Sequence, residues 1–205
     1  MGYEFEQTRL WQRTLGTRER DPQQHARERL RAALLKMRSN AAHLVKFIPE
    51  NCKGLTVHDV SHLDALWEMA DIISGDNFEF TPVDAFVFGA AVLIHDAGMS
   101  VASYPKGIPD LINTTEWHDI AAATLRRAGE RRITLDMLEN PPERFRPEIL
   151  FSVLRALHAK HAEELVSTSW KVPGGRRSTP FGRFRAECSI RSKHWPHCLQ
   201  PSLGH

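Results

Sequence analysis

The stretch AFVFGAAVLIHDAGMS, residues 85–100, is an apolar run that ends in a histidine and an aspartate. Thr81 and Pro82 precede it as a helix cap and a first-turn proline. The run from Ala85 to Ile94 is apolar on nearly every side and reaches a stop at Gly98, which predicts a buried helix. Such a helix needs other elements packed around it, so the stretch indicates the core of a folded domain.

The aspartate that follows this run, Asp96, needs something to neutralise it. Burying an unpaired carboxylate is costly. An intramolecular Arg or Lys would serve, but a metal ion shared with the adjacent His95 accounts for both residues at once. The turn at a helix end lets two adjacent side chains approach one point.

A second histidine motif lies upstream, in LTVHDVSH, residues 55–62. If this segment is helical, His58 and His62 lie one turn apart and can reach the same ion or substrate. Imidazole and carboxylate ligands favour Mn, Fe, Co, Ni or Zn over Mg, although any of these divalent cations is a candidate. The alternative for either histidine taken alone is a cap-side or partly exposed residue without a metal.

Helical periodicity recurs along most of the chain and predicts an all-α fold. The helices are expected at Asp21 to about Phe47 with Asp21 as a cap, at about His58 to Ser74, at Thr115 to Arg127, and at Pro147 to Val166. We divide the chain into an N-terminal helical segment (1–54), a metal-binding domain (55–170) and a basic, irregular or disordered tail (171–205).

Composition is that of a soluble protein, at 41% hydrophobic and 25% charged residues. No secretory signal, membrane-spanning run or disulfide framework is evident, so the cytoplasm is the expected location. The region from residue 171 onward carries seven Lys and Arg residues against one Glu. We expect a solvated extension there, with nucleic-acid binding as the less favoured alternative.

The two motifs resemble the HD-domain superfamily of metal-dependent phosphohydrolases, over residues 55–170. The resemblance implies that the all-α fold is an HD-type helical bundle. The resemblance implies that His62, His95 and Asp96 bind a divalent metal. The spacing of His58 and His62 also resembles the cyclic-nucleotide phosphodiesterase branch, which implies that His58 protonates the leaving oxygen.

A closer resemblance is to the bacterial HD variety often joined to a gyrase/chaperone-type ATPase module. It rests on TVHDVSH, HDAGMS and the later LRALHAKHA, residues 154–162. An ATPase-domain partner is therefore an implied expectation. Arg155 and His158 lie one turn apart and are candidates for a phosphate clamp and an additional acid or ligand. The alternative is a surface arginine and a polar-face histidine.

The sequence departs from the family where a fourth, distant Asp ligand should follow. Asp110, Asp119 and Asp136 are candidates by residue type alone, and His118 is either a ligand or a cap-region residue. The expected activity is hydrolysis of a nucleotide or related phosphoester. The alternative is a catalytically weakened module that senses a nucleotide or binds a protein. A zinc site from Cys188, His194, His197 and Cys198 is disfavoured, because their spacing fits no zinc pattern.

Overall fold

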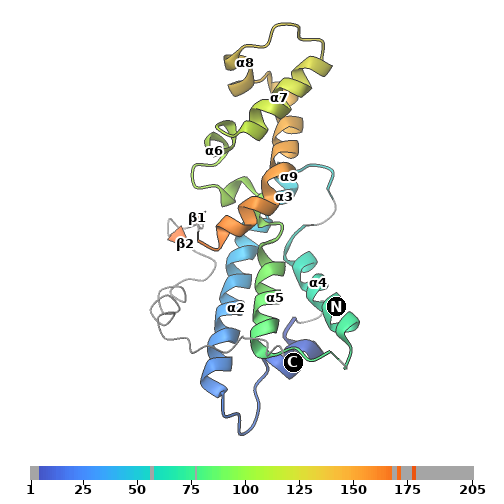
Figure 1. Cartoon of the computed structure of the whole chain (residues 1–205), viewed down its shortest axis with the longest axis vertical. Coiled ribbons are helices and arrows are strands. Elements are labelled where there is room, and N and C mark those ends of the chain that lie inside the picture. The colour runs from blue at the N-terminus through green and yellow to red at the C-terminus, as the bar shows by residue number, and fades with distance from the viewer. Residues whose placement is uncertain (1–4, 56–57, 77, 168–169, 172–176, 179–205) are drawn as a thin grey trace, which may run out of the picture.

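The chain folds as an all-α protein, as predicted, in a computed structural model that describes residues 5–55, 58–76, 78–167, 170–171 and 177–178 (Figure 1). Its α-helices are α1 (Arg9–Thr14), α2 (Gln24–Val45), α3 (Ile48–Asn51), α4 (Val60–Ser74), α5 (Pro82–Ile94), α6 (Ile108–Ile112), α7 (Thr115–Arg127), α8 (Leu135–Glu139) and α9 (Arg146–Leu165). Short 3₁₀ helices are η1 (Phe5–Gln7), η2 (Ala97–Met99), η3 (Val101–Ser103) and η4 (Glu143–Phe145). Trp170–Lys171 (β1) and Arg177–Ser178 (β2) pair antiparallel, with Trp170 opposite Ser178.

The core lies where α2, α4 and α5 meet and continues along α9. Leu34 of α2, Trp67 of α4, Ala85 of α5 and Leu154 of α9 are fully buried. Figure 1 shows α2 and α5 side by side in the lower half of the molecule, with α7 and α8 at the far end of α9. One cluster of buried apolar side chains extends from Phe5 to Leu157, so the N-terminal helical segment shares its core with the helices that follow.

The helix boundaries follow local capping. α2 begins at Gln24 rather than at Asp21, because Asp21 accepts a hydrogen bond from the Gln23 N–H and pairs with Arg27, which forms a turn before the helix. α5 begins where predicted, and Thr81 and Asp84 form a reciprocal capping box. Gly75 ends α4 with φ of 51°, a conformation that favours glycine. α7 matches the predicted span and is capped by Thr114.

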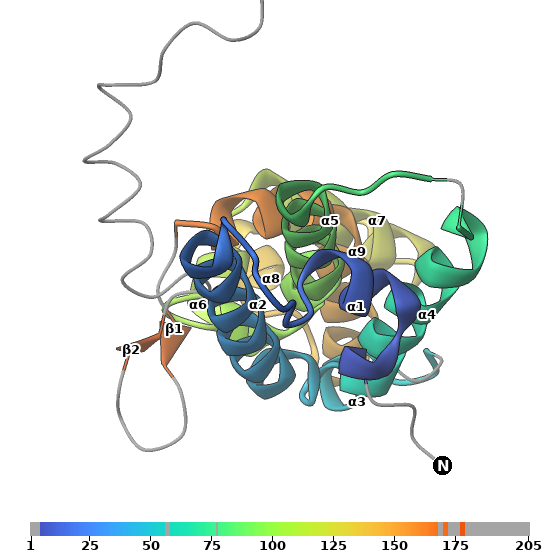
Figure 2. The same cartoon turned by 90° about the horizontal axis from the view of Figure 1, so that it is seen from below.

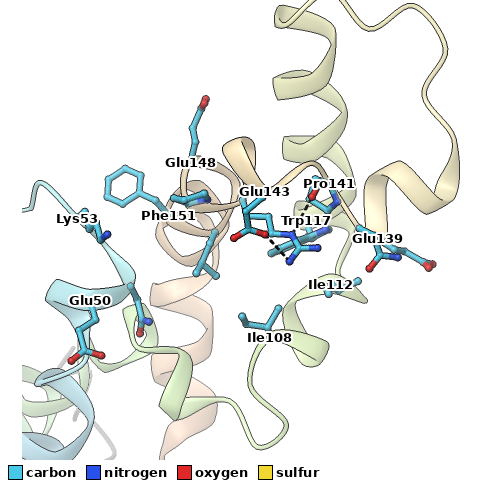
Figure 3. A pocket seen from close by; sticks show the side chains of 15 residues that line it. Glu50, Lys53, Ile108, Ile112, Trp117, Glu139, Pro141, Glu143, Glu148 and Phe151 are labelled. Carbon is cyan, nitrogen blue, oxygen red and sulfur yellow. Dashed lines mark hydrogen bonds and ion pairs between the residues drawn. The ribbon is translucent and has the colours of Figure 1, made fainter.

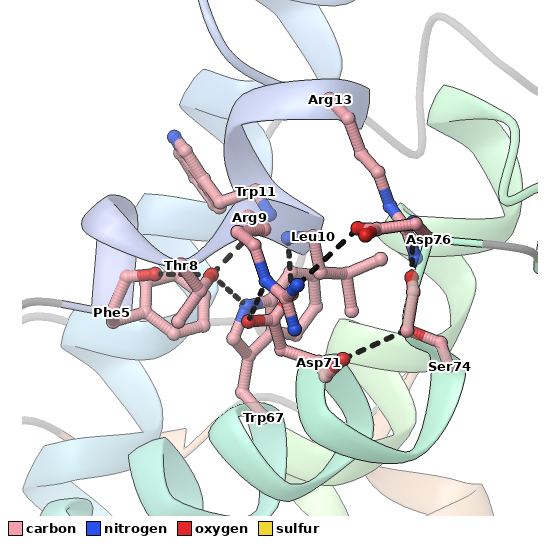
Figure 4. Close-up of polar contacts among 11 residues, drawn as sticks. Phe5, Thr8, Arg9, Leu10, Trp11, Arg13, Trp67, Asp71, Ser74 and Asp76 are labelled. Carbon is pink, nitrogen blue, oxygen red and sulfur yellow. Dashed lines mark hydrogen bonds and ion pairs between the residues drawn. The ribbon is translucent and has the colours of Figure 1, made fainter.

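The N-terminal helices η1 and α1 form a strap that packs against α4 (Figure 4). This contact was not predicted from the sequence. Trp67 Nε1 donates to Thr8 Oγ1 at 2.8 Å, and the Leu10 N–H donates to Asp71 Oδ1 at 2.5 Å. Arg13 donates to the Gly75 carbonyl and to Ser74 Oγ, which satisfies the C-terminal end of α4. The strap therefore fixes the helix that carries His62.

α5 is only half-buried, although the apolar run predicted a fully buried helix. Phe86 and Leu93 face the core, whereas Val83 and Val87 are 57% and 59% exposed. Within the described residues, one window, Pro82–Met99, is long and apolar enough to cross a membrane by composition, and 50% of it is buried in the fold. Core helices of soluble proteins meet the same criterion.

Cys52 lies in the core and should react slowly in the native chain. Its side chain is fully buried, and this burial raises the pKa of the thiol to about 11. Because the thiolate is the reactive form, we expect Cys52 in the native chain to react with iodoacetamide at pH 8 roughly a hundredfold more slowly than in the urea-unfolded chain. Peptide mass spectrometry measures this, and equal rates in the two states would contradict the buried placement.

The predicted tail and the disfavoured zinc site depend on residues that lie almost entirely outside the described part of the chain. Cys188, His194, His197 and Cys198 all belong to the undescribed residues. The boundaries of the three predicted segments stay predictions.

Candidate metal centre

His62 lies in the first turn of α4, whereas His58 precedes the helix. The prediction that both occupy one helix is wrong, because Asp59 caps α4 by accepting a 2.8 Å hydrogen bond from the Ser61 N–H. The extended backbone at Asp59 nevertheless brings the two imidazoles together, with ring centroids 5.1 Å apart. The expected proximity is therefore present without the expected helix.

His95 and Asp96 follow the last turn of α5. His95 Nδ1 lies 2.7 Å from the carbonyl oxygen of Val92, and because a carbonyl can only accept, Nδ1 is the donor. In the neutral imidazole this tautomer leaves Nε2 as a lone-pair donor for a metal. The Asp96 side chain is only 11% exposed, in agreement with the buried carboxylate expected from the sequence.

The three imidazoles converge on one carboxylate oxygen of Asp96. Asp96 Oδ2 lies 2.9 Å from Nε2 of His95, 3.5 Å from Nε2 of His62 and 3.9 Å from Nε2 of His58. The potential ligand atoms of His58, His62 and Asp96 all lie within 4.8 Å of one another. Segments that are more than thirty residues apart in the chain thus meet at a single point.

The electrostatics of the centre depend on the pair formed by His95 and Asp96. In the protonated ring His95 Nε2 donates to Asp96 Oδ2, and this hydrogen bond raises the pKa of His95. Burial opposes ionisation of Asp96, but the hydrogen bond from His95 and the positive charges of the three histidines outweigh it and lower the pKa of Asp96. In the described residues Asp96 has histidines as its ion partners and no Arg or Lys, so the alternative of a neutralising Arg or Lys is not found there.

This donor set fits a divalent transition metal. Three imidazole nitrogens and one carboxylate are the ligands that Mn, Fe, Co, Ni and Zn accept, whereas Ca²⁺ prefers oxygen ligands only. His58, His62 and Asp96 form the most compact group, and His95 adjoins it through its contact with Asp96. The geometry therefore includes His58, which the sequence analysis assigned to proton transfer.

α9 packs against η2, the short helix that follows Asp96. Gly98 packs so tightly against α9 that a Cβ atom there would lie 2.5 Å from the His158 carbonyl oxygen. His158 Nδ1 lies 2.6 Å from the Arg155 carbonyl oxygen, which leaves Nε2 of the neutral ring without a proton. The Arg155 guanidinium lies 5.9 Å from the centroid of the Phe151 ring. The structure therefore brings the backbone of His158 against the motif, while the roles of both side chains stay predictions.

The three candidates for a fourth acidic ligand lie outside the compact group. Asp110 accepts from the Lys106 N–H and Asp136 from the Asn140 side chain, while Asp119 is exposed on α7. His118 lies in the first turn of α7, and its Nε2 is buried without a hydrogen-bond partner among the described residues.

A separate cavity of about 600 Å³ lies between α3, α6, α7 and α9 (Figure 3). Its wall includes Trp117, Ile108 and Phe151, with Lys53 and Glu50 at one side. None of His58, His62, His95 and Asp96 lines it. Its lining contains no histidine, so the residues suited to bind a transition metal lie at the histidine cluster and not in this cavity.

Comparisons with known proteins agree with this geometry. A family model described as HD-CE matches residues 51–192, well over half of the chain. The matched region contains His58, His62, His95, Asp96, Arg155 and His158, and it extends past residue 170, where the sequence analysis ended the metal-binding domain. No curated protein and no solved structure shows a significant match. With an HD-type domain that gathers three histidines around one buried aspartate, the chain belongs to the HD-CE family.

Proposed function

We propose that the protein is a metal-dependent phosphohydrolase that acts on a nucleotide or a related phosphoester. The observation that carries the proposal is the convergence of His58, His62 and His95 on Asp96 Oδ2 within an HD-type domain. Joining to a gyrase/chaperone-type ATPase module stays an expectation from the resemblance.

His62, His95 and Asp96 would hold the divalent ion. When bound, such an ion would supply Lewis acidity for a phosphoryl oxygen and for a water. The hydrogen bond from His95 Nδ1 to the Val92 carbonyl keeps the ring oriented with Nε2 toward Asp96. The surrounding fold limits access of bulk water to Asp96, which strengthens every charge interaction at the centre.

His58 would donate a proton to the leaving oxygen, and Arg155 would stabilise negative charge on the phosphoryl oxygens. His58 suits proton transfer because its Nε2 is the farthest of the three from Asp96 Oδ2, at 3.9 Å. Its backbone lies outside α4, at the edge of the centre. His158 is the second candidate for acid or base, since its Nε2 is free of the bond that holds Nδ1.

The test of this function is turnover by the full chain after reconstitution with Mn, Fe, Co, Ni or Zn. Bis(p-nitrophenyl) phosphate and p-nitrophenyl phosphate separate diesterase from monoesterase activity, and a nucleotide panel then narrows the substrate. Metal-dependent hydrolysis would support the proposal. Bound metal without turnover of any of these compounds would favour the alternative of a sensing or interaction module.

Replacing His58 with alanine tests its separate role. If His58 transfers a proton, His58→Ala retains metal but loses turnover by about 10²–10⁴-fold, the usual contribution of acid–base catalysis. Elemental analysis and the rate of ester hydrolysis are measured on the same sample. His25→Ala is a matched control, because the His25 side chain is 99% exposed on α2. Loss of metal together with activity would instead make His58 a ligand.

A further inference from the structure

An exposed apolar surface covers α4 and α5, and we refer to it as the α4–α5 face. Six of the nine large apolar side chains that are exposed in the described part of the chain belong to it: Met69, Ile72, Ile73, Phe78, Val83 and Val87, each more than half exposed. Contiguous exposed apolar patches of this kind mark interaction surfaces rather than ordinary solvent-facing surface.

Aromatic side chains connect the two helices beneath the face, down to the buried Trp67. Met69, Ile72 and Ile73 share one side of α4, and Val83 and Val87 lie one turn apart on α5. Aromatic contacts bridge them, from Phe78 to Phe80 at 4.8 Å, from Phe80 to Phe88 at 6.2 Å and from Phe88 to Trp67 at 5.9 Å between ring centroids. Figures 1 and 2 show α4 along the flank of the molecule, joined to α5 by the connection that precedes Pro82.

The composition of α5 indicates that this face is covered by another molecule. From Pro82 to Ile94 the helix has Asp84 as its one charged residue. A helix that is apolar on all sides is buried on all sides. In this fold, however, α1, α2 and α4 cover part of the helix and leave Val83, Val87 and Ala91 exposed.

The acidic charge around the face favours a basic binding partner. Residues 60–94 contain six Asp and Glu residues and no Lys or Arg. Asp64 pairs with Arg38, and Asp71 and Asp76 pair with Arg9. Glu68 and Glu79 form no ion pair among the described residues. Two copies of the face would bring acidic residues together, whereas a basic partner would neutralise them.

We propose that the α4–α5 face binds an amphipathic helix of a partner protein, with an apolar stripe flanked by Lys and Arg. The exposed apolar side chains of two neighbouring helices offer a surface against which a third helix can pack. His62 at the start of α4 and His95 just after the end of α5 lie together, with ring centroids 5.8 Å apart, so the two helices approach each other at the metal centre. The bound helix therefore lies beside the metal centre.

Synthetic peptides of about 18 residues, long enough to form a helix, test the proposal. One carries a leucine stripe flanked by lysines, a second carries the same stripe flanked by glutamates, and a third carries the lysines with alanines in place of leucines. Fluorescence anisotropy with the full chain measures their affinities. We expect the leucine–lysine peptide to bind at least roughly tenfold more tightly than either other peptide.

Variants locate the binding surface. Ile73→Ser combined with Val87→Ser should weaken the leucine–lysine peptide at least about tenfold, because both side chains are exposed anchors for the stripe. Leu135→Ser is the matched control, since Leu135 is 61% exposed on α8, and it should leave the affinity unchanged. Glu79→Lys should weaken the lysine peptide and strengthen the glutamate peptide. Circular dichroism establishes that each variant keeps its helix content.

Equal binding of the leucine–lysine and leucine–glutamate peptides, or binding unaffected by the double variant, would overturn the proposal. A dimer in light scattering that the double variant abolishes would assign the face to a second copy instead. Binding to phosphatidylcholine vesicles that the double variant abolishes would assign it to a membrane. None of these readouts depends on metal or turnover, so the proposal fails or stands separately from the proposed function.

Discussion

We expect Asp96→Ala to lower the metal content of the purified chain by at least about tenfold. Its Oδ2 atom is the point on which all three imidazoles converge, and changes to groups that merely orient a ligand already cost about 10–100-fold in metal affinity. Elemental analysis measures the loss directly. Turnover should fall with the metal content.

The control for this variant is Asp119→Ala, because Asp119 is an exposed aspartate on α7. A second readout is the melting temperature, which metal should raise in the wild type and leave unchanged in Asp96→Ala. Undiminished metal content in Asp96→Ala would show that the ion, if any, is bound elsewhere.

Gly98→Ala should destabilise the fold by about 1–3 kcal/mol and lower the metal content as well. The added methyl group would lie 2.5 Å from the carbonyl oxygen and 2.9 Å from the Cα atom of His158. These are backbone atoms of α9, so the methyl group forces apart α9 and the segment that follows Asp96. Urea unfolding measures the stability, and elemental analysis measures the metal.

Gly89→Ala provides a matched comparison. Its added methyl group would meet side-chain atoms of Trp67 and Leu34 at 2.8–2.9 Å rather than backbone. Leu34 can change rotamer, and alanine is favoured over glycine within a helix by roughly 0.5–1 kcal/mol. Gly89→Ala should therefore cost less than Gly98→Ala and retain metal. The reverse order would contradict the tight packing assigned to Gly98.

The metal motif and the main helices could be predicted because their signals are local. Thr81, Pro82 and Gly75 define the ends of α5 and α4 through capping and backbone conformation. The buried state of Asp96 follows from the apolar run before it. These features depend on residues that are neighbours in the sequence.

Features that depend on tertiary packing were missed. Leu10, Trp11 and Leu15 are buried, but they stand among polar residues, and contact with other helices, α4 and α5 among them, makes them core residues. The exposed side of α5 could not be predicted, because a helix that is apolar all round gives no signal for the side that lacks a partner. His58 was expected inside α4, since the periodicity did not show that Asp59 caps the helix.

The meeting of η2 with α9 likewise depends on tertiary packing. Gly98 and His158 are sixty residues apart in the sequence, and neither motif indicates the other. The expectation that Arg155 and His158 act at the metal centre therefore rested on the family resemblance.

Elemental analysis of the full chain, wild type beside His95→Ala, shows whether the histidine cluster binds a metal. His95 Nε2 contacts Asp96 Oδ2 at 2.9 Å, and the hydrogen bond from Nδ1 to the Val92 carbonyl orients the ring. We expect stoichiometric transition metal in the wild type and at least about tenfold less in His95→Ala, with the helix content unchanged. A wild-type chain that stays free of metal after incubation with Mn, Fe, Co, Ni and Zn, or a variant that binds as much as the wild type, would contradict this expectation.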